Sequence, residues 1–219
     1  MQPTTHLSTQ LSMQLSTHLP ELFHLGDLGL TLPAAGAIAA WLCAVRAWRA
    51  AAGWALVFSL AIAFVAATKI AFLGWATGLP ALQFKAVSGH ATGFTAAFPT
   101  LCWLLAARCP ARMRAAVALA ALLLAAGVAA ALVQAGEHTR AEAAAGWLLG
   151  AAVFACALRL TADVPAAPPR AAATAATAAI LAFGLTAWIV EHAPLNVWMV
   201  AVALALSGNA SPYPWDSCG

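Results

Sequence analysis

The chain has 219 residues, of which 63% are hydrophobic and only 8% are charged, and its mean hydropathy is +0.87. Soluble domains carry about 25% charged residues, so a soluble fold could not bury this much apolar surface. The formal charge of +3 is small and the arginines are spread over short loops, which argues against nucleic-acid binding. The composition therefore predicts an integral membrane protein.

Long apolar segments follow one another along the chain and predict membrane helices. A bilayer core needs about 20 apolar residues in a helix, and unbroken runs of Ala and Leu are typical of helices. A further apolar stretch, 195–207, is short, and we interpret it as a re-entrant or interfacial piece or a truncated span. We predict an all-α integral membrane protein with a bundle of six transmembrane helices. The predicted spans are approximately 28–45, 52–75, 91–107, 113–135, 142–160 and 172–190.

The two ends of the chain give no functional signal. Residues 1–27 contain no Lys or Arg, so they do not have the form of an ordinary secretory signal peptide. Their three histidines are too irregularly spaced to indicate a metal site, and the five cysteines of the chain form no Cys-x-x-Cys pair. We divide the chain into a low-complexity N-terminal tail (1–27), a membrane domain (28–207) and a C-terminal tail (208–219).

The basic residues predict the orientation in the membrane. Arginines cluster in the loops that follow the first, third and fifth spans, and such loops face the cytoplasm. The opposite side receives the loop with Ser88-Gly89-His90 and the turn with His138. Two polar motifs are thus expected at one non-cytoplasmic face, which in a bacterium is the periplasmic face of the inner membrane.

The first motif is Ser88-Gly89-His90, with Lys69 near the end of the preceding span. Ser88 is suited to cap the helix that begins near Gly89, and the free N–H groups of a helix start attract an anion. His90 falls in the first turn, where it can donate a proton to a leaving oxygen. A tripeptide of this kind also occurs by chance, as a helix cap beside an interfacial His.

The second motif combines His138 with Glu142, four residues later at a helix start. Residues i and i+4 share one face of a helix, and a carboxylate there can hold one nitrogen of a histidine and leave the other for nucleophilic attack. Gly146 and Gly150 continue the same ridge. The alternative interpretation is a polar helix start in which the helix dipole favours Glu142.

Taken together, these motifs resemble those of the type-2 phosphatidic acid phosphatase (PAP2) superfamily over about residues 65–152. In that family a Lys-containing motif precedes Ser-Gly-His, and the last motif ends in His-x-x-x-Asp followed by spaced glycines. The resemblance implies a helix bundle of the PAP2/chloroperoxidase type, with its core at about 52–160. It also implies a membrane phosphatase that acts on lipid phosphates or lipid pyrophosphates without a metal or cofactor.

The resemblance further implies a role for each matching residue. His138 corresponds to the nucleophile, Glu142 to its orienting partner and His90 to the general acid. The phosphate would be bound by the remaining three residues, Lys69, Ser88 and Gly89.

The chain departs from the family pattern at several positions. Ala76-Thr77 stands where the family usually has Arg-Pro, and Leu132 replaces the arginine six residues before the nucleophilic His. Val87 replaces a proline, and Glu142 replaces Asp. A phosphoryl transition state needs cations. Two nearby cations are candidate substitutes, although interfacial anchoring is the preferred interpretation of both: Lys85 and Arg140.

The sequence therefore predicts a phosphatase of a lipid phosphate or isoprenoid pyrophosphate that works through a phosphohistidine. The missing arginines motivate an alternative, a catalytically degenerate relative that binds a lipid headgroup or a membrane partner. A small transporter ranks lowest, because the chain shows no inverted repeat.

Overall fold

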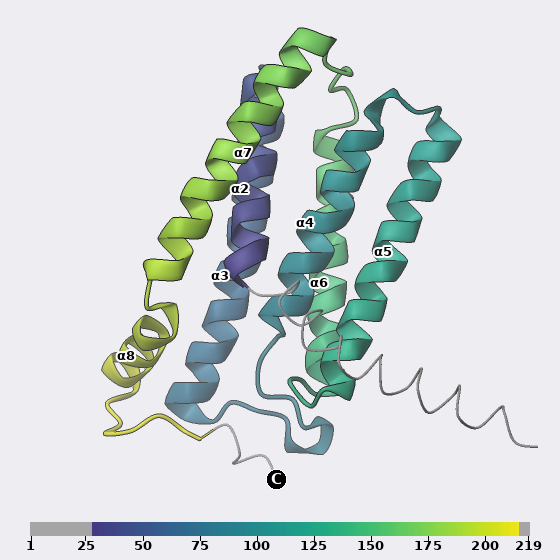
Figure 1. Ribbon diagram of the computed structural model, residues 1–219. Coiled ribbons are helices and arrows are strands. Elements are labelled where there is room, and N and C mark those ends of the chain that lie inside the picture. The colour runs from purple at the N-terminus through teal and green to yellow at the C-terminus, as the bar shows by residue number, and fades with distance from the viewer. Residues whose placement is uncertain (1–27, 215–219) are drawn as a thin grey trace, which may run out of the picture.

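The computed structural model describes residues 28–214, which form a bundle of helices (Figure 1). The N-terminal repeat with His6, His18 and His24 lies outside this range, as does the end of the chain from residue 215. The long helices are α2 (Leu28–Ala44), α3 (Trp48–Trp75), α4 (Gly89–Leu105), α5 (Ala111–Gln134), α6 (Arg140–Leu160), α7 (Pro169–His192) and α8 (Leu195–Ser207). Short 3-10 turns occur at Pro80–Leu82 and Ala106–Arg108.

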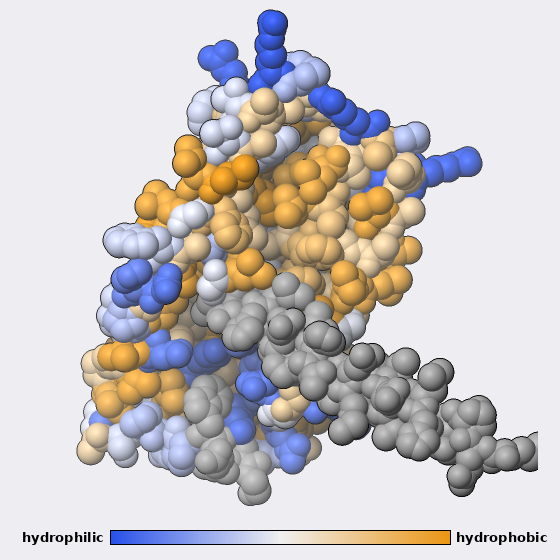
Figure 2. All heavy atoms as spheres, viewed as in Figure 1, coloured by the Kyte–Doolittle hydropathy of each residue, from blue (hydrophilic) through white to orange (hydrophobic). Residues whose placement is uncertain are grey.

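The expectation of an all-helical membrane protein is confirmed for the described residues, whereas the count of six spans is not. Four helices are long and apolar enough to cross a membrane: α3, α5, α6 and α7. Helices α2 and α4 have 17 residues each, and α8 has 13. In Figure 2, hydrophobic side chains cover the middle of the visible face and hydrophilic ones gather toward its ends. This distribution fits a protein that lies in a membrane.

Helix α4 lies at the centre of the bundle, where it contacts α2, α3, α5 and α6 (Figure 1). Most residues from Gly89 to Thr100 are small and buried. Their size lets the neighbouring helices approach α4 closely. Helix α7 packs along α2, and α8 packs against α3. The main core fills the space between α2, α3, α4 and α6, and its largest fully buried members are Trp54, Ile38 and Leu42.

Two glycines of α6 set the distance to α4. A Cβ added at Gly146 would stand 2.5 Å from the carbonyl oxygen of Ser88, and one added at Gly150 would stand 2.6 Å from that of Thr92. Real Cβ atoms do not approach a carbonyl so closely, so only glycine permits this packing. The consequence is that the starts of α4 and α6 lie side by side.

The connections divide between the two ends of the bundle. The α4–α5 and α6–α7 connections lie together at one end (Figure 1), where the Arg108 side chain donates to the carbonyl of Ala167. The α3–α4 connection and the α5–α6 turn lie at the other end. The arginine-bearing loops and the two polar motifs are therefore at opposite ends, as the sequence predicts.

Candidate active site

The connection from α3 to α4 is held in place before it reaches Ser88. An isolated bridge pairs Leu79 with Phe84, and the backbone N–H of Val87 donates to the Thr68 hydroxyl over 3.2 Å. A proline has no N–H to donate. Val87, at the position where the PAP2 pattern commonly has proline, thus makes a contact that proline cannot make.

Ser88 begins α4 as its N-cap, as predicted. Its hydroxyl oxygen accepts from the N–H of Ala91 at 3.2 Å, and its side chain is fully buried. Its own N–H donates to the backbone carbonyl of Glu142 over 3.2 Å. The start of α4 is thereby tied to the first turn of α6, and His90 follows in the first turn of α4.

The turn between α5 and α6 delivers His138 to the same place. Gly136 has a φ of 79°, a left-handed conformation that ends α5. The N–H of Gly136 donates to Val133 and that of Glu137 to Leu132, which is the hydrogen-bond pattern of a Schellman cap. Residues Glu137 and His138 then stand between the two helices, directly before the cap of α6.

Helix α6 begins with a capping box made by Thr139 and Glu142. The Thr139 hydroxyl accepts from the N–H of Glu142 at 3.3 Å, and the Glu142 carboxylate accepts from the N–H of Thr139 at 3.1 Å. The reciprocal bond needs a Glu or Gln side chain three residues after the cap. Glu142 therefore has a structural reason to be longer than the Asp of the family pattern.

The Glu142 carboxylate serves three partners. Besides Thr139, its Oε1 accepts from the backbone N–H of Lys85 at 3.0 Å, and its Oε2 lies 3.3 Å from Nδ1 of His138. The side chains of His138 and Glu142 are only 15% and 7% exposed. One carboxylate thus joins the loop before α4, the cap of α6 and the imidazole of His138.

His90 and His138 face each other across the junction of α4 and α6. Nε2 of His138 lies 3.5 Å from Nδ1 of His90, and the ring centroids are 5.6 Å apart at an angle of 57°. Because Nδ1 of His138 is held by Glu142, Nε2 is the nitrogen presented to the second histidine. A group bound there would have a nucleophilic nitrogen and a proton donor within reach.

These side chains line a cavity of about 590 Å³. It brings together five of the predicted site residues, namely Lys69, Lys85, His90, His138 and Glu142. Its remaining wall comes from Leu73 on α3, Gly136 and Glu137 in the turn, and Asn196, Met199 and Val200 on α8. The cavity contains two cationic side chains, two carboxylates and both histidines, so it is suited to proton transfer, and its two lysines can pair with an anionic group.

Three predicted residues do not line this cavity. Ser88 and Gly89 are buried, and Ser88 caps α4. Arg140 is exposed and lines a neighbouring cavity of about 870 Å³ that also borders Lys85, His138 and Glu142 but not His90. Lys85 is thus the candidate substitute cation that shares a cavity with both histidines. Whether Ser88 and Gly89 bind phosphate stays a prediction.

The two positions at which the family usually has arginine have different surroundings. Ala76 is exposed and ends α3 with a φ of 51°, and it does not line the cavity. Leu132 is only 2% exposed and packs with Ala91, Ala129 and Ala143 in a small core cluster. An apolar contact between α4, α5 and α6 therefore takes the place of one missing cation.

Sequence reasoning missed the contribution of α8 and of Glu137. The stretch 195–207 was predicted only as a short apolar segment, and its polar Asn196 carried no motif. Glu137 directly precedes the predicted nucleophile in the chain, and this position is the signal that could identify it. Among residues 28–214, no group of three or more His, Cys, Asp or Glu side chains is placed to hold a metal ion.

Comparisons with known proteins agree with the motifs. The family model described as the PAP2 superfamily matches residues 73–165, a range that contains His90, His138 and Glu142. A curated relative from Klebsiella pneumoniae, described as an uncharacterized 22.5 kDa protein in the cps region, is 36% identical over 141 residues. That alignment covers 64% of this chain and 68% of the relative. No solved structure is significantly similar to the chain.

Proposed function

The chain belongs to the PAP2 superfamily, and from this premise we propose that it is a membrane phosphatase working through a phosphohistidine intermediate. The proposed substrate is a lipid phosphate or an isoprenoid pyrophosphate. The observation that carries the proposal is the line of contacts from Glu142 through His138 to His90, over 3.3 Å and 3.5 Å. This arrangement supplies an orienting carboxylate, a nucleophile and an acid, each in contact with the next.

In the first step, Nε2 of His138 attacks the phosphorus and forms a P–N bond. The P–O bond to the leaving group breaks, and protonated His90 gives its proton to the departing oxygen. Glu142 stabilises the positive charge that develops on His138. For a monophosphate the leaving group is a lipid alcohol, and for a pyrophosphate it is the lipid monophosphate.

In the second step, water attacks the phosphorus of the phosphohistidine. Neutral His90 now takes a proton from the water, the P–N bond breaks, and inorganic phosphate leaves. This restores the imidazole of His138 and the protonated form of His90. Each proton given in the first step is thereby recovered in the second.

Cations must stabilise the phosphoryl oxygens in both steps. Lys69 and Lys85 are the proposed donors, because both line the cavity with the two histidines. Arg140 is the weaker candidate, since it lines only the neighbouring cavity. Ser88 and Gly89 are proposed to act through the start of α4, whose free N–H groups attract an anion.

The cavity is proposed to face the periplasm of a bacterial inner membrane. It lies at the end of the bundle opposite the arginine-bearing connections, and such connections remain in the cytoplasm. A lipid substrate would then present its headgroup from the outer leaflet.

Phosphate release in detergent tests the proposal. Wild-type protein is expected to release phosphate from lipid phosphates or pyrophosphates with EDTA present, and His138→Ala and His90→Ala are each expected to abolish release. Release that persists in His138→Ala would refute the assigned nucleophile.

A specific observation favours a second candidate, a relative that binds a lipid headgroup without turnover. The position of one family arginine is filled by Leu132, which is buried among apolar side chains. If this candidate is correct, the protein should bind lipid phosphate without releasing inorganic phosphate, and Lys69→Ala should weaken that binding. Folded wild-type protein that binds but never releases phosphate would favour it over the phosphatase.

A further inference from the structure

Helix α8 forms a wall of the candidate active site although it lies outside the residues that match the family model, 73–165. Asn196 in its first turn, and Met199 and Val200 one turn later, line the cavity. Positions i, i+3 and i+4 share one face of a helix. One face of α8 is therefore turned toward His90 and His138.

The end of the chain fastens α8 to α3. The side-chain amide of Asn209 donates to the carbonyl of Gly74 over 2.7 Å, and the N–H of Tyr213 donates to the carbonyl of Leu73 over 2.9 Å. These two carbonyls belong to the last turn of α3, about one turn beyond Lys69. The wall is thus fixed beside a proposed phosphate-binding residue.

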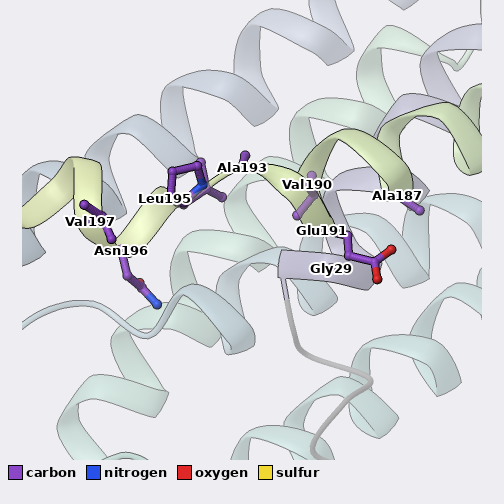
Figure 3. Close-up of a pocket in the computed structure, with 9 residues that line it drawn as sticks. Gly29, Ala187, Val190, Glu191, Ala193, Leu195, Asn196 and Val197 are labelled. Carbon is purple, nitrogen blue, oxygen red and sulfur yellow. The ribbon is translucent and has the colours of Figure 1, made fainter.

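A second hollow, of about 650 Å³, adjoins the cavity at Asn196. It lies where Pro194 separates α7 from α8 and is bordered by the start of α2 at Gly29. Figure 3 shows Ala187, Val190 and Glu191 on its α7 side and Leu195, Asn196 and Val197 on its α8 side. Asn196 lines both spaces, so it stands at the boundary between the cavity with the histidines and lysines and a groove that is lined by Glu191 and by apolar side chains such as Val190, Leu195 and Val197.

We propose that Asn196 binds the substrate at the point where its phosphorylated headgroup joins its apolar chain, and that α8 thereby selects for chain-bearing phosphates. This inference rests on the proposed function. The carboxamide N–H group would donate to the oxygen that links the phosphate to the chain, which is held beside Asn196 only while the chain lies in the groove, and the amide carries no charge that would repel an anion. The chain would lie in the groove at the α7–α8 break, against Val190 and Leu195.

Steady-state kinetics with two classes of substrate test the inference. The probes are a long-chain lipid phosphate in detergent micelles and a short, water-soluble phosphomonoester. Asn196→Ala is expected to raise KM for the lipid phosphate about tenfold, the effect of losing one hydrogen bond to a charged group. Its kcat should stay near the wild-type value, because binding common to ground and transition states is lost. KM for the soluble ester should change much less.

Two further variants separate contact from structure. Asn196→Gln keeps the carboxamide and is expected to recover part of the affinity, whereas Asn196→Asp adds a negative charge and should bind more weakly than Asn196→Ala. Val202→Ala is the matched control, since Val202 is on the same helix, 43% exposed and outside both spaces. It should leave KM unchanged for both substrates.

The outcomes also separate this inference from the proposed function. An active wild-type protein whose lipid and soluble kinetics are unchanged by Asn196→Ala would overturn the role of Asn196 and leave the phosphatase intact. An inactive wild-type protein would instead refute the phosphatase, and direct binding of the same lipid phosphate would then decide. Weaker binding by Asn196→Ala would support the role of Asn196, and equal binding would overturn it.

Discussion

Nδ1 of His138, just before the cap of α6, lies 3.3 Å from Oε2 of Glu142 in the first turn of that helix. The same carboxylate accepts from the backbone N–H groups of Thr139 and Lys85. The imidazole is therefore oriented by a group that is itself fixed by two backbone donors. A carboxylate held in this way needs little rearrangement when the histidine gains charge.

The role of this carboxylate is testable with Glu142→Gln. The amide keeps the size of the side chain but replaces one acceptor oxygen with a donor, which cannot accept from Nδ1–H of His138. We expect kcat for phosphate release to fall by about 10²-fold or more. The control is Glu137→Gln, which removes a carboxylate from an exposed position in the same cavity. Equal activity of Glu142→Gln and wild type would contradict an orienting role.

The close approach of α4 and α6 predicts a strong effect of Gly146→Ala. The new methyl would stand 2.5 Å from the Ser88 carbonyl oxygen, so the helices must separate. Overpacking of this kind costs about 1–3 kcal/mol and would move His90 away from His138. We expect a lower thermal midpoint and lost phosphate release.

Gly127→Ala is the matched control for that substitution. Gly127 lies on the exposed side of α5, and a Cβ there would meet nothing within 4 Å. Alanine is favoured over glycine inside a helix by up to about 1 kcal/mol, so the midpoint of thermal unfolding should remain at the wild-type value or rise. A similar loss of stability in both variants would show that packing against α4 is not the cause.

Restoring the family arginines is expected to fail for two different reasons. Leu132→Arg places a charge without a partner in an apolar cluster, and such burial costs several kcal/mol. It should prevent the accumulation of folded protein in the membrane. Ala76→Arg should fold, because Ala76 is exposed, and should leave the release rate unchanged, because that position does not line the cavity. Monodispersity in detergent and phosphate release measure the two effects, and a folded, more active Leu132→Arg would contradict the assignment.

The two candidate substitute cations are expected to differ in importance. Lys85 lines the cavity with both histidines, whereas Arg140 lines only the neighbouring one. Lys85→Ala should lower kcat/KM by about 10²-fold, the effect of losing one donor to developing charge, and Arg140→Ala should lower it far less. A larger effect of Arg140→Ala would reverse this order and place the phosphate in the neighbouring cavity.

Several features of the fold and site follow directly from the sequence. The hydropathy pattern predicts helices that the structure also has, with ends that differ by a few residues, as when α3 begins at Trp48 instead of 52. The Ser88 cap of α4 was predicted from its side chain alone. The resemblance to the PAP2 superfamily, drawn from scattered single residues, is confirmed by the family comparison.

Other features depend on contacts between distant segments and could not be predicted. In the sequence, Glu142 is only a departure from the Asp of the family pattern. Its hydrogen bond to the backbone of Lys85, 57 residues away, cannot be inferred from the sequence. The contribution of Asn196 to the cavity requires the packing of α8 against α3. Helices α2 and α4 are too short to count as spans by length alone, which left the predicted number of six unconfirmed.

The capping box of α6 has a consequence for how this site could be observed. The amide protons of Thr139 and Lys85 are both hydrogen-bonded to one carboxylate, so their exchange with solvent deuterium requires that carboxylate to move. Protection of these two amides should therefore rise and fall together, although the residues are 54 positions apart in the chain. Hydrogen exchange at a helix start would thus report whether the Glu142 carboxylate is in this position, and the measurement would not require turnover.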